Sequence, residues 1–383
     1  MKPQVAKELV VQAGKRLVES GLIARTWGNV SCRISSNMFV ITPSGRDYLT
    51  LTPDEIVTLR IPDLSYTGDV KPSSEKGIHA AVYTLRPDIG FVIHTHQQKA
   101  SAAGSLGMDS LKLPDGEIIC AAYGLPGTKK LRKGVIDALG RSTKNALIMR
   151  NHGALCFGRD YQETFDAAAS LEDFCEEFIR TEYCKKSNSV EYNADEYRQF
   201  ALHLGSFPPA FHETSESERT ESGFVFRTGG VSQQITFAGN TVSLTPMQKI
   251  HSQIYLHNAK INAIVDSTTP NIAAVAHKGN KLLPLLDDFA QIAGRTIHTV
   301  PNNPDAIARA FGGVSAVLVQ DGFAVSTGGS LGDAQAVSMV MDKNCEATIA
   351  AALFGKIKPI AALDCTLMRF VYQRKYATLA SKK

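Results

Sequence analysis

Apolar and polar residues follow two different periods along this chain, and these periods predict which segments are helices and which are strands. Residues 4–20 and 161–184 carry apolar side chains at the spacing of a helix. A third helix is expected to start at Pro72-Ser73-Ser74, because serine caps a helix and Ile78 begins an apolar stripe. Short apolar runs typical of buried strands lie between these helices: NVSCRI, MFVIT, GFVIHTH and ALIM. This order predicts an α/β or α+β fold, with a central sheet flanked by helices.

The apolar pattern occurs twice. Residues 78–103 align with residues 250–275 at a constant offset of 172. Residues 146–158 likewise resemble residues 316–328. The matched segments keep their order and nearly their spacing, which indicates a tandem duplication.

A boundary between the two copies is predicted where the hydrophobic period stops. Residues 206–222 are rich in Pro, Ser, Thr and Glu and are therefore expected to form a linker. The predicted organisation is a first domain over residues 1–205, this linker, and a second domain over residues 223–383.

Composition narrows the class of partner. The 383 residues are 44% hydrophobic and 20% charged, with a net charge of +4 that is not concentrated in any basic block. Nucleic acid and anionic membranes are therefore not expected as partners. No run approaches the ~20 apolar residues of a membrane span, and no signal-peptide core is visible. The seven cysteines form no CxxC pair, so reduced thiols and a cytoplasmic location are expected.

Three histidines stand at the ends of predicted strands. His94 and His96 are two residues apart at the end of an apolar strand, so both side chains can reach the same ion. His152 follows a second apolar strand in the same way. Three histidines are the protein ligands of a common type of catalytic zinc site. The alternative is that they are ordinary polar strand ends.

The second copy argues for a shared role of these histidines. The positions aligned with His94, His96 and His152 hold Asp266, Thr268 and Asp321. The three histidines are lost together while the surrounding apolar pattern is kept, as expected of residues that act as a unit.

Several polar segments could bind an anion. Ser73-Ser74-Glu75 stands at a predicted helix N-terminus, where free N–H groups and the helix dipole favour phosphate, and Glu75 is a candidate base. The aligned residues of the second copy are Thr245-Pro246-Met247, without a carboxylate. Gly28-Asn29 and Ser44-Gly45 are further candidate loops. Plain helix capping and tight turns are the alternatives.

Taken together, the motifs of the first 190 or so residues resemble the class II aldolase/adducin family, in particular its L-fuculose-phosphate aldolase type. In chain order they are TWGNVS (26–31), ITPSG (41–45), PSSE (72–75), RPD and VIHTH (86–96), AYGLPGT (122–128) and NHG (151–153). The second copy resembles the same fold without its site. The resemblance implies two tandem domains of this type, each with a mostly antiparallel central sheet.

The resemblance also implies a site. One Zn²⁺ per chain, or another divalent transition metal, would bind His94, His96 and His152, with Glu75 as both base and ligand. The implied phosphate-binding residues are Gly28, Asn29, Ser44, Gly45, Ser73 and Ser74. Tyr123 falls where these aldolases have a tyrosine that helps to protonate the aldehyde oxygen, although the AYGLPGT motif around it departs from their pattern. They also use a C-terminal aromatic residue, for which Tyr183, Tyr192 and Tyr197 are available.

The implied activity is retro-aldol cleavage of a ketose 1-phosphate to dihydroxyacetone phosphate and an aldehyde. A pentulose-phosphate epimerase, a methylthioribulose-1-phosphate-type dehydratase and a non-catalytic adducin-like scaffold are the alternatives. The family forms four-fold rings, so a homodimer of tandem chains that mimics such a ring is expected. The second domain would then be structural and would take the place of a neighbouring subunit. The alternative is that it only stabilises the chain or binds an unrelated partner.

Overall fold

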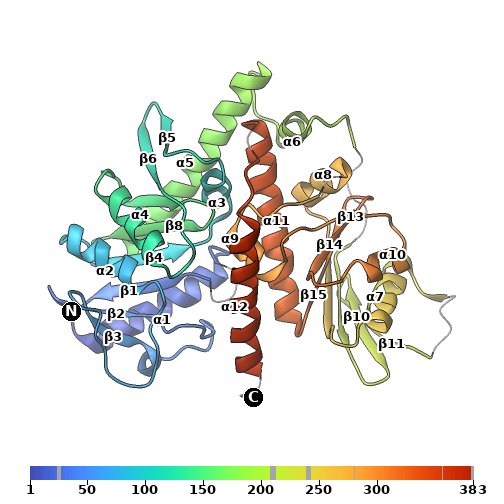
Figure 1. Ribbon diagram of the computed structural model, residues 1–383, viewed down its shortest axis with the longest axis horizontal. Coiled ribbons are helices and arrows are strands. Elements are labelled where there is room, and N and C mark those ends of the chain that lie inside the picture. The colour runs from blue at the N-terminus through green and yellow to red at the C-terminus, as the bar shows by residue number, and fades with distance from the viewer. Residues whose placement is uncertain (24–26, 208–212, 239–242, 280, 356, 381–383) are drawn as a thin grey trace. The chain divides into compact units, whose positions relative to one another are not determined.

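The computed structural model describes all residues except 24–26, 208–212, 239–242, 280, 356 and 381–383. It divides into two compact units, Met1–Glu182 and Tyr183–Lys383. Figure 1 shows the order of their helices and strands.

Within the residues that the structure describes, the first unit begins with a helix and contains eight strands. Its helices are α1 (Pro3–Glu19), the 3₁₀ helix η1 (Pro53–Glu55), α2 (Lys76–Leu85), α3 (Gln98–Gly104), α4 (Lys129–Leu139) and α5 (Tyr161–Ser187), which continues into the second unit. Its strands are β1 (Asn29–Arg33), β2 (Met38–Ile41), β3 (Val57–Arg60), β4 (Phe91–Thr95), β5 (Ser110–Leu113), β6 (Gly116–Ala121), β7 (Ala146–Met149) and β8 (Gly153–Gly158). The helices expected over residues 4–20 and 161–184 correspond to α1 and α5.

The strands of the first unit form one sheet in the order β3-β2-β1-β4-β8-β7-β6-β5. All neighbouring pairs are antiparallel except β6 and β7. Apolar residues of α2 and α4 pack together with those of β2, β3, β7 and β8 in one core. These two helices therefore cover the same face of the sheet.

The second unit repeats this architecture. Its helices are α6 (Ala194–Leu202), α7 (Pro246–His257), α8 (Pro270–Lys278), α9 (Asp287–Ile292), α10 (Pro304–Arg309), α11 (Leu331–Leu353) and α12 (Ala362–Ala380). Its strands are β9 (Ser215–Arg219), β10 (Gly223–Thr228), β11 (Val231–Thr236), β12 (Ala263–Ser267), β13 (Thr299–Val300), β14 (Ala316–Val319) and β15 (Phe323–Gly328). The sheet order is β11-β10-β9-β12-β15-β14-β13, and β13–β14 is the parallel pair. The predicted fold class of two tandem domains, each with a mostly antiparallel sheet, is confirmed.

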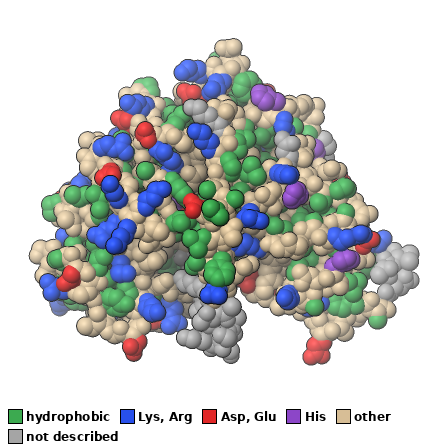
Figure 2. All heavy atoms as spheres, in the orientation of Figure 1, with side chains coloured by type: hydrophobic (Ala, Val, Ile, Leu, Met, Phe, Trp, Pro, Cys, Tyr) green, Lys and Arg blue, Asp and Glu red, His purple; other side chains and the backbone are tan. Residues whose placement is uncertain are grey.

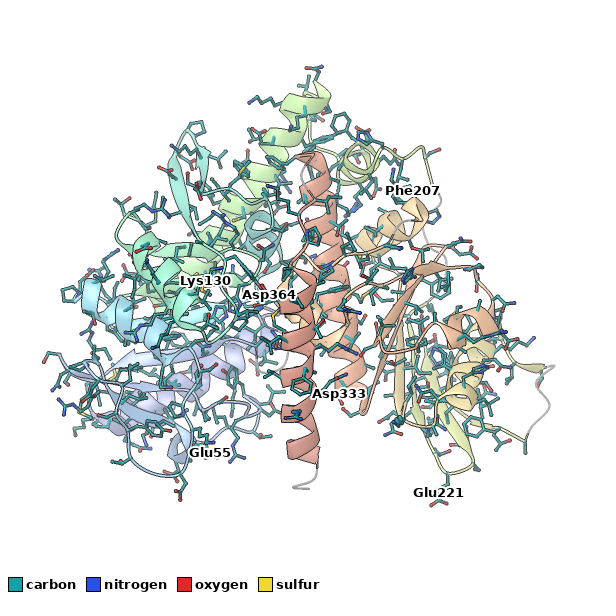
Figure 3. All side chains as sticks on the ribbon, in the orientation of Figure 1. Glu55, Lys130, Phe207, Glu221, Asp333 and Asp364 are labelled. Atoms are coloured by element: carbon teal, nitrogen blue, oxygen red, sulfur yellow. The ribbon has the colours of Figure 1, made fainter. Side chains whose placement is uncertain are left out.

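The duplication extends further towards the N-terminus than the sequence alignment indicates. Residues 206–222, expected to be a linker, contain strand β9, which pairs with β10 and β12 inside the second sheet. Residues 208–212 of that range lie outside the described residues. The turn after β9 carries Glu221, whose side chain points outward (Figure 3). Arg33 of β1 and Arg219 of β9 both donate to a tyrosine carbonyl, of Tyr83 and Tyr255 respectively.

The strand registers correct one sequence equivalence. β7 and β8 join through residues 150–152, and β14 and β15 join through residues 320–322. Met149 pairs with Gly153, as Val319 pairs with Phe323. Gly322 therefore takes the place of His152, and Asp321 takes the place of Asn151. The earlier equivalence of His152 with Asp321 is wrong by one residue.

No helix in the described part of the chain has both the length and the hydropathy to cross a bilayer. On the face shown in Figure 2, Lys and Arg side chains are spread out, with Asp and Glu side chains among them.

Candidate active site

The sheet of the first unit brings the predicted site segments to one edge. Strands β4, β6 and β7 end at the same edge, since β6 and β7 are parallel and β4 and β7 are both antiparallel to β8. β1 is antiparallel to β4, so it begins at that edge, and β2 ends there. The bridge between Pro43 and Pro72 brings the start of α2 to the same place.

At this edge, three imidazole rings and one carboxylate converge. His94 lies on β4, His96 directly after it, and His152 in the turn between β7 and β8. The Nε2 atoms of His94 and His96 are 3.0 Å apart. Glu75, the N-cap residue of α2, places its carboxylate oxygens 3.1 Å from His152 Nε2 and 3.5 Å from His94 Nε2. All four side chains are buried.

The turn that holds His152 depends on its two neighbours. Asn151 has a φ of +58°, a conformation that asparagine tolerates better than most residues. Gly153 packs so close to β4 that an added Cβ would lie 2.2 Å from the Thr95 carbonyl oxygen. The Asn-His-Gly sequence thus lets the turn between β7 and β8 pack closely against β4, which places the His152 ring beside that of His94.

We expect Gly153→Ala to destabilise the protein by about 1–3 kcal/mol, because strands β4 and β8 must separate to admit the methyl group. Urea unfolding measures the change. Gly140→Ala is the control, since its added Cβ would lie 3.7 Å from its nearest neighbours, the carbonyl oxygens of Asp137 and Ile136. Equal stability of the two variants would contradict the packing argument.

The arrangement of the histidines fits a divalent metal ion. His94 Nδ1 lies 2.9 Å from the Ala154 carbonyl oxygen, so this nitrogen carries the proton and Nε2 presents its lone pair to the cluster. One ring nitrogen from each histidine lies within 4.8 Å of the others. Two imidazole nitrogens bound to the same tetrahedral zinc ion are about 3.4 Å apart, close to the 3.0 Å between the Nε2 atoms of His94 and His96. Burial lowers the pKa of His94 to about 3, which keeps the ring in the neutral form that binds metals.

Glu75 is ionised in this site. Burial alone would raise the pKa of its carboxyl, but His94 and His152 beside it, with hydrogen bonds from His152 and Asn29, hold that pKa well below its usual range. The Asn29 amide donates to Glu75 Oε2 over 2.9 Å. The carboxylate is therefore in the charged form that a base needs.

The contacts of Asn29 were not foreseen from the sequence. Its side chain is 4% exposed and joins Glu75 to His79 of α2. His79 in turn contacts Ser31, whose hydroxyl contacts Tyr83. The sequence does contain one signal for this contact. His79 follows Glu75 by four residues, about one helical turn, so the two side chains are expected on the same side of α2.

The remaining predicted phosphate residues lie on loops at this edge. Gly28 has a φ of +125°, and an added Cβ would lie 2.7 Å from the His94 carbonyl oxygen. Gly45 also has a positive φ. The Ser73 hydroxyl accepts from the Glu75 N–H over 3.2 Å, whereas Ser74 is exposed. Ser44 donates its N–H to the Lys71 carbonyl. Thr26, which begins the TWGNVS motif, lies outside the described residues.

The predicted tyrosines differ in their surroundings. Tyr123 is half-buried on the loop from β6 to α4, at the same sheet edge as His152. Tyr183, Tyr192 and Tyr197 belong to the second unit and pack on one another with ring centroids 5.7–5.8 Å apart.

The second unit has different chemistry at the matching edge. Asp266 stands where His94 stands in the first, and it accepts hydrogen bonds from the backbone and hydroxyl of Ser215. Asp321 is exposed and accepts from Asn302 over 2.7 Å. Met247 replaces Glu75. The acidic and apolar residues there do not reproduce the three-histidine cluster.

Comparison with known proteins agrees with these observations. The sequence matches the family described as Class II Aldolase and Adducin N-terminal domain over residues 8–179 and 231–349. It is 31% identical to a 5-deoxy-D-ribulose 1-phosphate aldolase of Bacillus thuringiensis, over 45% of this chain and 83% of that protein. It is 29% identical to an L-ribulose-5-phosphate 4-epimerase of Salmonella paratyphi C, over 44% of this chain and 82% of that protein.

Among solved structures, an L-fuculose 1-phosphate aldolase is similar, with 27% identity and a TM-score of 0.43, over 50% of this chain and 92% of that one. Since the family match covers most of the sequence and falls in both copies, the chain belongs to the class II aldolase and adducin family.

Proposed function

We propose that this protein is a metal-dependent lyase that cleaves a ketose 1-phosphate to dihydroxyacetone phosphate and an aldehyde by retro-aldol chemistry. The observation that carries the proposal is the buried Glu75 carboxyl group, whose oxygens lie 3.1 Å and 3.5 Å from ring nitrogens of two of the three convergent histidines. The similarity to an aldolase of a deoxyribulose 1-phosphate supports the substrate class.

In this proposal His94, His96 and His152 hold one divalent ion, with Zn²⁺ as the expected one. When bound, such an ion supplies Lewis-acid stabilisation of negative charge on the substrate oxygens. We also propose that the metal site belongs to the first unit alone, and that the second unit, which includes strand β9, forms a metal-free domain.

The residues of this chain would move two protons. In the condensation direction, Glu75 removes the proton from the hydroxymethyl carbon beside the ketone of dihydroxyacetone phosphate. The resulting enediolate carbon attacks the aldehyde carbon, and the Tyr123 hydroxyl gives a proton to the aldehyde oxygen. In cleavage, the proton of the corresponding hydroxyl passes through the Tyr123 oxygen and solvent to the Glu75 carboxylate, the carbon–carbon bond breaks, and Glu75 gives a proton to the enediolate carbon.

The substrate phosphate would bind on the loops around Gly28, Ser44, Gly45, Ser73 and Ser74. Removing both serine hydroxyls by Ser73→Ala with Ser74→Ala is expected to raise KM for a phosphorylated substrate more than for its unphosphorylated analogue. Since Ser73 also caps the Glu75 N–H, Ser74→Ala alone serves as the cleaner variant. Equal effects on both substrates would exclude this phosphate site.

An epimerase is a second candidate, because one similar protein is an L-ribulose-5-phosphate 4-epimerase. The test is to incubate zinc-loaded protein with a panel of ketose and pentulose phosphates and to identify the products. Dihydroxyacetone phosphate plus an aldehyde supports the aldolase. A pentulose phosphate with inverted configuration at one carbon supports the epimerase, and a product that has lost water supports a dehydratase. No product from any substrate supports a scaffold.

We further propose that the chain works as a homo-oligomer, in the first instance a dimer of tandem chains. Light scattering during size-exclusion chromatography measures the assembly. A monomer at micromolar concentration with full activity would contradict it.

A further inference from the structure

A continuous line of buried hydrogen bonds runs from Tyr83, in the last turn of α2, to the Glu75 carboxylate. Tyr83 contacts Ser31 over 2.7 Å, and Ser31 contacts His79 Nδ1 over 2.6 Å. His79 Nε2 contacts Asn29 Oδ1, and the Asn29 amide donates to Glu75. His79 and Ser31 are 0% exposed and Tyr83 is 2% exposed.

The donors in this line point one way. Asn29 gives an N–H to the carboxylate, so its oxygen faces His79, and His79 Nε2 must carry a proton. His79 Nδ1 then accepts from the Ser31 hydroxyl, whose oxygen accepts from Tyr83. Each group is thereby held in one orientation, and the line ends on an anion, which strengthens the last bond.

The second unit contains the same three residues without this ending. Ser217 contacts His251 Nδ1 and the Tyr255 hydroxyl, each over 2.9 Å. His251 Nε2 then lies 3.5 Å from Asp266, with no asparagine between them. Ser215 occupies the place of Asn29, since each lies two residues before the serine of its unit: Ser31 pairs with Val92 of β4, and Ser217 pairs with Ile264 of β12. The hydrogen-bonded serine, histidine and tyrosine are therefore common to both units, whereas the connection through Asn29 to a glutamate is a feature of the first unit.

We propose that His79 is a positioning residue that acts through Asn29 to hold the Glu75 carboxylate at the histidine cluster. The proposal rests on the function proposed above and assigns the Asn29 side chain to Glu75 rather than to the substrate phosphate. An asparagine held on one side only could rotate its amide and turn its oxygen towards the carboxylate. His79 prevents this rotation because its Nε2–H donates to the Asn29 amide oxygen and would lose that acceptor if the amide turned.

The two units supply a matched pair of variants. His79→Leu breaks the line, and His251→Leu removes the equivalent buried histidine where Asn29 is absent. His79→Gln keeps an N–H donor near the position of Nε2. Ser31→Ala and Ser217→Ala are the milder pair, for use if the leucine variants fail to fold.

For His79→Leu we expect kcat to fall about 10–100-fold with KM for the phosphorylated substrate nearly unchanged. His79→Gln is expected to recover part of the loss, and His251→Leu to leave kcat within about two-fold. If Asn29 instead binds phosphate, Asn29→Ser should raise KM selectively for the phosphorylated substrate. That result, or equal kcat losses in His79→Leu and His251→Leu, would overturn the proposal.

Crystal structures of the same variants test the positioning role separately from activity. We expect Glu75 displaced or in several conformers in His79→Leu, and unmoved in His251→Leu. A Glu75 that stays in place in His79→Leu overturns this inference even if the enzyme is active. If the wild-type protein is inactive on the whole substrate panel but Glu75 is displaced in His79→Leu, only the proposed function is contradicted.

Discussion

Replacing Glu75 by glutamine is expected to lower kcat by at least ~10²-fold, the usual scale for loss of a general base. Glutamine keeps the size and much of the hydrogen bonding of the side chain but cannot accept the substrate proton. The three histidines remain, so bound metal should be largely retained. Turnover and metal content of the same preparation measure both effects.

Glu172→Gln is the matched control for this charge change. The Glu172 carboxylate accepts the backbone N–H groups of Lys99 and Ala100 at the start of α3. We expect Glu172→Gln to lower the stability of the protein and to leave kcat nearly unchanged, since this carboxylate caps the N-terminus of α3. Unchanged turnover in Glu75→Gln would remove the proposed base, whatever the control shows.

Much of the fold could be predicted because its signals are local. Apolar periodicity placed α1 and α5 to within a few residues, and the repeated pattern indicated two copies of one domain. The meeting of His94, His96 and His152 could also be foreseen, because strand ends in one sheet share an edge and the second copy lacks all three.

Strand β9 could not be predicted because its buried positions are polar. Ser215 and Ser217 are at most 2% exposed, and their hydroxyls bond to Asp266, His251 and Tyr255 inside the unit. A strand whose inward side chains are serines shows no apolar alternation, so the sequence pattern predicts a linker there.

The role of the Asn29 side chain was hidden for a different reason. Its partners Glu75 and His79 are 46 and 50 residues away, and only the pairing of β1 with β4 beside α2 brings them together. From the sequence alone, Gly28-Asn29 is equally consistent with a loop that binds an anion. Long-range hydrogen bonds of this kind leave no periodic signal in a sequence.

The largest effect is expected for the histidine cluster itself. We predict about one divalent ion per chain, bound by the first unit only, and His94→Ala should abolish both metal binding and turnover. His94 contributes Nε2 at the centre of the cluster, 3.0 Å from His96 and 3.5 Å from Glu75, so its loss leaves two histidines that no longer form a three-nitrogen site.

Asp266→Asn is the control, because Asp266 holds the position of His94 in the second unit. Since Asn can still bond to Ser215, we expect the fold and the metal content to be unchanged in this variant. Elemental analysis after dialysis, with circular dichroism to verify folding, measures the outcome. Two ions per chain in the wild type, metal retained by His94→Ala, or metal lost in a folded Asp266→Asn would each contradict a single metal site at the histidine cluster.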